Sequence, residues 1–246
     1  MEDSQLMRYK RHLLLPQVDV AGQQRLLNAR VLVVGAGGLG SPVLMYLAAA
    51  GIGCLHFHDD DNVEISNLQR QILFDSQLIG QSKATAAAQR LRRINPECEV
   101  IAEGTRLTGG ALTNAVADAD LVIDCSDNFS TRFEVNRSCV ENGKSVISGA
   151  VIRLEGQVSV FSGHLPDKPC YQCLYQPDAY NDESCTSSGV LGPVVGVIGS
   201  ILATEAVKRI AGIGDSLEGR LLLFDALSMR FNELTLNKDP GCPVCN

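Results

Sequence analysis

The sequence contains no tryptophan, few basic residues and no uninterrupted apolar segment long enough to span a membrane. Its 246 residues include 21 Lys and Arg against 28 Asp and Glu, which gives a net charge of −7. Sequence-independent binding to nucleic acid or to anionic membranes requires many clustered cations, and the chain has no basic cluster. A hydrophobic content of 45%, without low-complexity tracts or repeats, excludes a disordered chain. We therefore expect a folded protein that binds neither nucleic acid nor membrane.

Signals for membrane insertion or export are also missing from the sequence. The opening residues, MEDSQLMRYKRH, carry charges of both signs and lack the apolar stretch of a signal peptide. The longest apolar run, Val190 to Ala203, is interrupted by Pro193 and by glycines, and it is shorter than the roughly 20 residues that a membrane span needs. We expect this run to begin a buried helix, and we expect a cytoplasmic protein.

Cysteine is abundant for a reducing compartment, where disulfides are uncommon. Four of the nine cysteines form two CxxC pairs, Cys170 with Cys173 and Cys242 with Cys245. Two thiolates at this spacing hold one face of a tetrahedral zinc ion, and a second pair completes the coordination. The alternatives are a thioredoxin-like redox motif or four unrelated thiols. The pairs predict a four-cysteine zinc site, which would be structural because four thiolates leave no open coordination position.

The remaining cysteines and the histidines give weaker signals. Apolar neighbours indicate that four other cysteines pack in the core: Cys54, Cys98, Cys125 and Cys139. The four histidines show no spacing typical of metal ligands, and we expect surface or core positions for His12, His56, His58 and His164.

Residues 30–59 follow the pattern of a nucleotide-binding βαβ unit. An apolar run at 30–34 ends in the loop Gly35-Ala-Gly-Gly-Leu-Gly40, and a helical segment follows at 41–50. A second apolar run at 54–58 leads directly to Asp59. In such units the glycines let phosphates approach the backbone, and the acid binds a ribose hydroxyl. A glycine-rich turn that serves only packing is the alternative interpretation.

The alternation of strands and helices continues and then changes near residue 150. Helices are expected at 82–94, 110–116 and 131–141, with strands at 99–102, 121–125 and 145–148. Beyond them, strands at 157–161, 220–224 and 232–236 are accompanied by a helix at 197–211. This order predicts an α/β fold with a Rossmann-like, doubly wound and mostly parallel sheet that is extended by antiparallel strands. We expect one domain over 1–246, with a nucleotide-binding half at 1–150 and a second half at 151–246.

Polar residues after the glycine loop suggest how a nucleotide would be held. No GxxxxGK[ST] sequence is present, so the phosphates are not bound by a P-loop. The segment Ser66-Asn-Leu-Gln-Arg-Gln71 and Lys83 place amide, guanidinium and ammonium groups near the expected phosphate end. Asp127 follows another strand, where the ligand crevice of such a sheet opens, and one carboxylate there suits Mg²⁺. Solvated surface charge is the alternative for each cation, and capping of a turn is the alternative for nearby Asp124.

These segments together resemble the MoeB/ThiF family, the bacterial relatives of ubiquitin-activating enzymes. The resemblance runs from about Met7 to Cys245 and is most specific in SNLQRQ and the two CxxC pairs. It is also carried by the glycine loop, Lys83, Asp124-x-x-Asp-Asn128, Ser148-Gly-Ala and Glu155-Gly-Gln157. The resemblance implies ATP-dependent adenylylation of the C-terminal glycine of a ubiquitin-like sulfur carrier by a homodimer. A nucleotide-dependent oxidoreductase shares the glycine pattern and is the more remote alternative.

The resemblance also implies roles for individual residues. The ATP site would be lined by Gly38, Asp59, Ser66, Asn67, Leu68, Gln69, Arg70, Lys83, Asp127 and Asn128. Asp127 would organise Mg²⁺, the four CxxC cysteines would hold zinc, and Arg11 would reach into the neighbouring subunit's site. The implied catalytic residues are Arg11, Arg70, Lys83, Asp127 and Cys185. Cys185 matches a family cysteine that can link covalently to the carrier, but the acids beside it disfavour a reactive thiolate.

The choice of carrier depends on two sets of local similarities. The segment Ser148 to Gln157 and the ending GCPVC resemble the molybdopterin-synthase type, whereas Asp59 to Asn62 and Arg106 to Gly109 resemble the thiazole type. We favour the molybdopterin carrier, with the thiazole-pathway carrier as the alternative. Because the sequence has no rhodanese-like extension, we expect a separate sulfur donor, either a cysteine desulfurase or a rhodanese-like protein.

Overall fold

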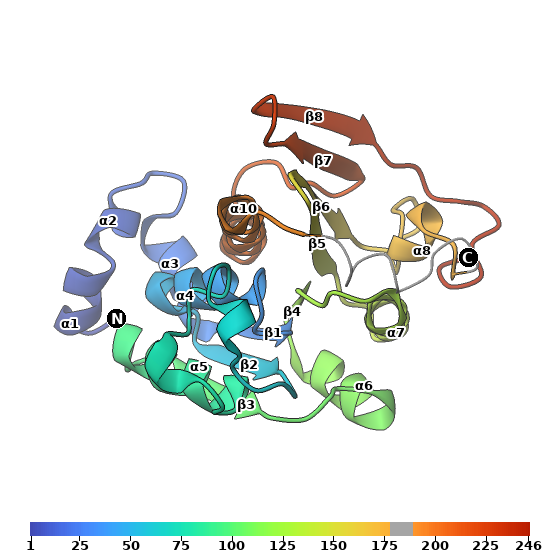
Figure 1. Ribbon diagram of the computed structural model, residues 1–246. Helices are drawn as coiled ribbons and strands as arrows, with labels where there is room; N and C mark the ends of the chain where they lie inside the picture. Colours follow the sequence, from blue (N-terminus) through green and yellow to red (C-terminus); the bar gives the residue numbers. More distant parts are fainter. Residues whose placement is uncertain (178–188) are drawn as a thin grey trace.

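The computed structural model describes residues 1–177 and 189–246 and places a mixed sheet of eight strands at the centre (Figure 1). The strand order is β3-β2-β1-β4-β5-β6-β7-β8. The first five strands along the chain pair in parallel, and β6, β7 and β8 continue the sheet by antiparallel pairing. The strands are β1 Arg30–Val34, β2 Cys54–His58, β3 Glu99–Glu103, β4 Leu121–Asp124, β5 Val146–Ile152, β6 Glu155–Phe161, β7 Arg220–Asp225 and β8 Arg230–Thr235.

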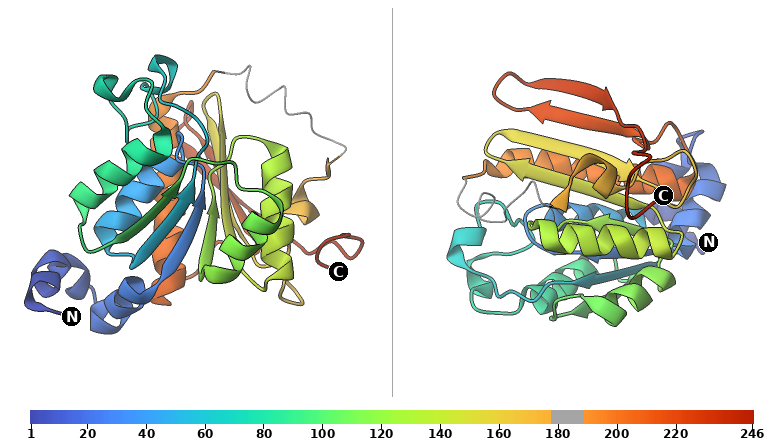
Figure 2. Two further views of the ribbon diagram at one scale, coloured as in Figure 1. Left: turned by 90° about the horizontal axis from the view of Figure 1, so that it is seen from below. Right: turned by 90° about the vertical axis from the view of Figure 1, so that its right-hand side faces the viewer.

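Helices cover both faces of this sheet, as the views in Figures 1 and 2 show. One face packs against α3 Asp19–Asn28, α4 Gly40–Ala50, α5 Lys83–Ile94 and α10 Gly192–Ala211. The other packs against α6 Gly109–Asp118, α7 Phe129–Glu141 and α8 Tyr171–Leu174. The remaining helices are α1 Asp3–Arg8, α2 Lys10–Leu13 and the 3₁₀ turns η1 Ile65–Asn67 and η2 Ser76–Leu78.

The two hydrophobic cores follow from side-chain alternation along β1. Val31 and Val33 lie in the core beneath α4 and α10, whereas Leu32 and Val34 lie in the core beneath α6 and α7. Successive side chains of a strand point to opposite faces, so a strand covered on both sides is apolar throughout. The run at Arg30–Val34 therefore identifies a central strand rather than an edge strand.

The loop between β1 and α4 depends on two of its glycines. Gly35 adopts a φ of +92°, a conformation that side chains disfavour. A Cβ atom on Gly40 would lie only 2.1 Å from the carbonyl oxygen of Gly35. Glycine at both positions therefore lets the chain turn sharply at the end of β1 and lets α4 begin directly against the strand.

The expected α/β fold with parallel strands followed by antiparallel strands is confirmed. The helix expected at 197–211 begins earlier, at Gly192, because Pro193 lies in the first turn of α10, where its missing N–H is not needed. Helices α1 to α3 were not anticipated from the sequence. The four cysteines expected in the core, Cys54, Cys98, Cys125 and Cys139, are buried. Across the described residues, no helix is both long and apolar enough for a membrane span.

Candidate active site and cysteine cluster

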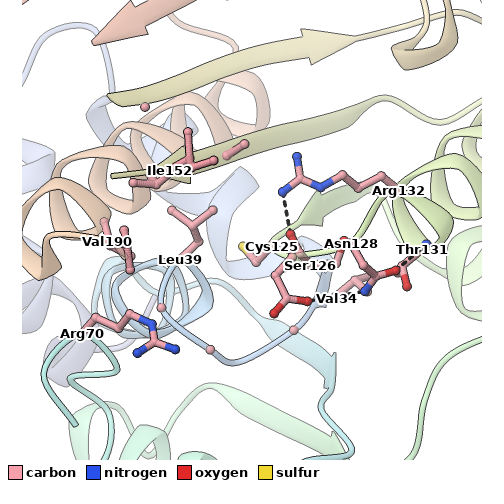
Figure 3. A pocket seen from close by; sticks show the side chains of 18 of the residues that line it. Val34, Leu39, Arg70, Cys125, Ser126, Asn128, Thr131, Arg132, Ile152 and Val190 are labelled. Carbon is pink, nitrogen blue, oxygen red and sulfur yellow. Dashed lines mark hydrogen bonds between the residues drawn. The ribbon is translucent and has the colours of Figure 1, made fainter. Parts of the chain in front are cut away.

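A cleft of about 1130 Å³ opens at the carboxyl ends of β1, β2 and β4 (Figure 3). Its inner end is formed by the glycine loop at 35–39, the acidic segment at 59–61 and the turn at 125–128. From there it continues along β5, β6 and β7, where Ala150, Gly156 and Phe224 are among its lining residues. The cleft therefore joins the nucleotide-type βαβ unit to the antiparallel half of the sheet.

Asp59 links the glycine loop to the acidic segment. Its carboxylate accepts hydrogen bonds from the backbone N–H of Ala36, at 2.8 Å, and from that of Asp61, at 3.1 Å. Burial raises the pKa of Asp59, an effect that nearby Lys83 and the two N–H donors only partly offset. A carboxylate held in this way fixes the loop conformation and remains on the wall of the cleft.

Two cations line the cleft from the segment that follows β2. Lys83 begins α5, is 4% exposed, and its Nζ lies 2.8 Å from Oδ2 of Asp61. Arg70 donates from Nη1 to the carbonyl oxygen of Ser66 at 3.0 Å, and this is the one hydrogen bond of its guanidinium to the described residues. Both residues line the glycine-loop end of the cleft and bring positive charge to it.

The wall of the cleft opposite Lys83 and Arg70 is formed by the turn that follows β4. Asp124 is buried and accepts hydrogen bonds from the backbone N–H and the hydroxyl of Ser126, at 3.0 and 2.6 Å. The turn-capping alternative for Asp124 is thereby confirmed, and burial raises the pKa of this carboxyl. Asp127 is exposed and lines the cleft, and Asn128 caps α7 by accepting the N–H of Thr131 at 2.9 Å.

The structure separates the residues of the expected ATP site into two groups. Those that line the cleft are Gly38, Asp59, Ser66, Gln69, Arg70, Lys83, Asp127 and Asn128. Asn67 and Leu68 instead support the turn beneath it. The Asn67 side chain accepts the N–H of Glu64 at 3.2 Å, and Leu68 packs against the main core.

The structure does not place two residues of the expected catalytic set in the cleft, one because it lies elsewhere and the other because it is not among the described residues. Arg11 lies on α2, is exposed, and is not among the lining residues. Cys185 lies outside the described residues. Both therefore stay predictions.

Other polar residues of the cleft were missed by sequence reasoning. Gln71 is 4% exposed, and its Oε1 accepts no hydrogen bond within the described part of the chain. Arg132 donates to the carbonyl oxygen of Ser126 at 2.7 Å and stands across the cleft from Arg70 (Figure 3). Gln71 belongs to the SNLQRQ segment and could have been included on that signal. Arg132 lies within a helix, and nothing in its local sequence distinguishes it from a surface arginine.

The four CxxC cysteines come together between α8 and the last residues of the chain. The Sγ atoms of Cys170 and Cys242 are 3.5 Å apart, those of Cys173 and Cys245 are 3.5 Å apart, and those of Cys170 and Cys173 are 3.9 Å apart. All four thiols are free, and three of them are buried. Burial opposes ionisation of Cys242, but hydrogen bonds from the backbone N–H groups of Val244 and Cys245 and from the neighbouring thiols together lower the pKa of this thiol. The cluster can hold one metal ion.

Two of the four histidines, which were expected only at surface or core positions, lie beside a carboxylate. His56 and His58 lie on one face of β2, and their ring nitrogens meet a carboxylate oxygen of Glu103 on β3. Sequence spacing missed this group because the third residue comes from a neighbouring strand.

Comparisons with known proteins agree with this architecture. The chain is 44% identical to the sulfur carrier protein ThiS adenylyltransferase of Escherichia coli, over 100% of this chain and 97% of that protein. It is 43% identical to the molybdopterin-synthase adenylyltransferase of Salmonella typhimurium, over 100% of this chain and 98% of that protein. The crystal structure of E. coli MccB with ATP is similar in fold, with a TM-score of 0.84 at 23% identity, and covers 97% of this chain and 73% of that chain.

The sequence pattern of the ThiF family matches residues 9–244, nearly the whole chain. The two relatives named above align over 245 residues of it. The chain belongs to the ThiF family.

Proposed function

We propose that this protein uses ATP to adenylylate the C-terminal glycine of a small ubiquitin-like sulfur-carrier protein. The observation that carries the proposal is the continuity of the cleft. Lys83 and Arg70 provide positive charge at its glycine-loop end, whereas Gly156 and Gln157 line its extension beside the antiparallel strands. A nucleotide and an extended peptide tail fit such a cleft end to end. The adenylyltransferase names of the two relatives support the same reaction.

The chemistry requires positioning and charge stabilisation more than a nucleophile from the enzyme. A carboxylate oxygen of the terminal glycine attacks the α-phosphorus of ATP, and the bond to pyrophosphate breaks as the acyl-adenylate forms. Negative charge accumulates on the phosphate oxygens, where Lys83 and Arg70 would stabilise it. The N–H groups at the start of α4 would contact the phosphates, as helix N-termini commonly do. Asp59 would bind the ribose.

Two metal ions belong to the proposal. Asp127 presents an exposed carboxylate to the cleft and would hold Mg²⁺, which supplies charge neutralisation at the phosphates. The four cysteines would hold structural Zn²⁺. Zinc–sulfur bonds of about 2.3 Å in a tetrahedron correspond to sulfur separations of about 3.8 Å. The separations of 3.5 to 3.9 Å among Cys170, Cys173, Cys242 and Cys245 fit this geometry.

We further propose a homodimer in which Arg11 completes the site of the partner subunit. Its exposure on α2, away from the cleft of its own subunit, agrees with this role. The N-terminal helical region also exposes apolar side chains that an interface would cover, namely Met7, Leu14 and Val20. Residues 1–150 would bind the nucleotide and residues 151–246 the carrier and zinc, within one domain.

The preferred carrier is the small subunit of molybdopterin synthase, on the local similarities of 148–157 and of the C-terminal CxxC. The thiazole-pathway carrier is the alternative, since relatives of both names match this chain at comparable identity. A separate sulfur donor would convert the acyl-adenylate to the thiocarboxylate. Cys185 would matter only if the carrier is held covalently.

The decisive experiment is carrier-dependent exchange of pyrophosphate into ATP. Each of the two carriers is offered intact and without its terminal Gly-Gly. We expect exchange with the intact molybdopterin carrier and none with either truncated form. Exchange only with the thiazole carrier would reassign the pathway. No exchange with either, together with thermal protection by NAD(H) rather than by ATP, would replace the proposal with an oxidoreductase.

A further inference from the structure

A second cluster of metal-type ligands lies on the sheet itself, away from the cysteines. His56 and His58 are two residues apart on β2, so their side chains share one face of the sheet. On the parallel neighbour β3, Glu103 is the direct partner of His58. The neighbours of His56 and His58 on β1 are Leu32 and Val34, which belong to the core beneath α6 and α7. The cluster is thus fixed by sheet pairing rather than by loop conformation.

We propose that His56, His58 and Glu103 form a binding site for a divalent transition-metal ion of the Zn²⁺ type. The two histidine Nε2 atoms are 3.1 Å apart, Nε2 of His56 is 3.1 Å from Oε1 of Glu103, and Nε2 of His58 is 3.8 Å from the same oxygen. Zinc bonds to nitrogen and oxygen of about 2.0–2.1 Å place tetrahedral ligand atoms about 3.3–3.4 Å apart. The three separations bracket that value.

The orientation of His58 supports a metal-binding nitrogen. Its Nδ1 lies 3.4 Å from the carbonyl oxygen of Thr105, which can accept only from a proton-bearing nitrogen. With the proton on Nδ1, the lone pair of Nε2 points at the other two ligands. Backbone carbonyls that hold the second ring nitrogen in this way are the usual outer partners of metal-binding histidines.

The surroundings leave the site accessible from solvent. The side chain of Glu103 is 49% exposed, whereas that of His58 is 5% exposed and lines the cleft. Three side-chain ligands leave a fourth tetrahedral position for water or a small ligand. The site is also distinct in chemistry from the cysteine cluster, because it offers nitrogen and oxygen in place of sulfur. It does not depend on the proposed adenylylation.

The test is a titration of the purified full-length protein with Co²⁺, with the bound metal counted by mass spectrometry after native desalting. Cobalt at a four-cysteine site produces thiolate charge-transfer absorption, and cobalt at the proposed site does not, so the two can be followed separately. We expect a second equivalent of Co²⁺ to bind at the proposed site without producing thiolate absorption. Added Zn²⁺ should displace this second equivalent. Glu103→Gln and His56→Gln should each weaken this equivalent by at least about tenfold, because even outer-shell losses cost 10- to 100-fold.

The matched control is Glu99→Gln, which removes another exposed carboxylate from β3 outside the cluster. It should bind the second equivalent as the wild type does. The proposal is overturned if the wild type takes up no metal besides that at the cysteines, which would leave a hydrogen-bonded His–His–Glu group. It is equally overturned if Glu103→Gln and His56→Gln retain wild-type affinity for the second equivalent.

Discussion

Arg70 and Asp127 reach the cleft from opposite walls, and the proposed reaction needs both. Replacing either by alanine should lower carrier-dependent exchange by about 10²- to 10³-fold, as expected for loss of one group that stabilises developing charge. Zinc content should stay unchanged, since neither residue contacts the cysteine cluster. Arg93→Ala is the matched control, because Arg93 is an exposed arginine of α5 that does not line the cleft. Near-normal exchange in Arg70→Ala or Asp127→Ala would mean that the reaction occurs elsewhere.

The pKa of Asp59 predicts a pH dependence of stability with a definite sign. Burial raises this pKa in the folded protein, so the folded state binds the proton more tightly than the unfolded state does. At low pH the carboxyl group is protonated and does not destabilise the folded state. Ionisation of the buried group at higher pH lowers the free energy of unfolding. Relative to Asp59→Asn, the wild type should lose stability as the pH rises from about 4, the ordinary value, through the raised pKa.

Thermal unfolding of both proteins across this pH range measures the difference. Asp60→Asn, which removes an exposed carboxylate from the adjacent position, is the control. A difference between wild type and Asp59→Asn that grows in favour of the wild type with rising pH would contradict the argument.

Eight of the ten residues expected at the ATP site line the cleft, and each was indicated by a local sequence pattern or by the family resemblance. Gly38 and Arg70 belong to contiguous patterns, the glycine loop and SNLQRQ, whereas Asp59 was indicated by the apolar run before it and Lys83 by the family resemblance. Arg132 was not predicted, because only the folded structure brings this arginine of α7 to the turn after β4, where it donates to Ser126. The histidine cluster was missed for the same reason, since the partner carboxylate is supplied by a neighbouring strand.

At the scale of elements, the close approach of α4 to β1 holds the glycine loop, which lines the nucleotide end of the cleft, in its sharp turn. A methyl group at residue 40 would meet the carbonyl oxygen of Gly35 at 2.1 Å, and a backbone atom cannot move aside as a flexible side chain can. Gly40→Ala should therefore displace the loop, lower stability by about 1–3 kcal/mol and weaken ATP binding. Urea unfolding and calorimetric ATP titration measure the two effects.

The control for this substitution is Gly110→Ala, near the start of α6. A methyl group there meets no atom within 4 Å, so only helix propensity changes. This variant should be unchanged or more stable by up to about 1 kcal/mol, with normal ATP binding. Equal behaviour of the two variants would show that close approach at residue 40 is unimportant.

The sequence predicted helices and strands well where buried residues produce a clear hydrophobic pattern, and poorly where few residues are buried. Central strands such as β1 and β4 are almost wholly apolar, so their runs are unmistakable. The sequence pattern predicts the start of α10 too late, because Pro193 interrupts the apolar run and yet lies in the first turn of the helix. Helices α1 and α2 contain no fully buried residue, so the hydrophobic periodicity that marks a helix is absent from them.

For the whole molecule, the cysteine cluster ties the last residues of the chain to α8. Removal of the proposed zinc should release this connection and lower the melting temperature, because metal binding at a structural site contributes directly to folding. Release should be faster at low pH, since protons compete with zinc for the thiolates and burial raises the pKa of the Cys170 thiol. Hydrogen exchange before and after chelation should rise at 239–246 and in α8 while β1 and β4 stay protected. Unchanged exchange at 239–246 in zinc-free protein would exclude a structural role.

The assembly of two subunits can be tested by complementation between two inactive variants. Arg11→Ala and Asp127→Ala should each be inactive alone. In a mixed dimer, one site would contain intact Asp127 from its own subunit and intact Arg11 from the other, and the second site would lack both. Random exchange of subunits should then restore roughly a quarter of wild-type exchange activity, since half of the dimers are mixed and each has one complete site.

If Arg11 instead served the cleft of its own subunit, every site in the mixed dimer would lack one of the two groups and no activity would return. Lys10→Ala, at the neighbouring exposed cation of α2, should be active by itself and serves as the control for general damage to this helix. Restored activity therefore requires both a dimer and contribution of Arg11 across its interface. That arrangement accounts for an exposed arginine outside the cleft of the chain that carries it.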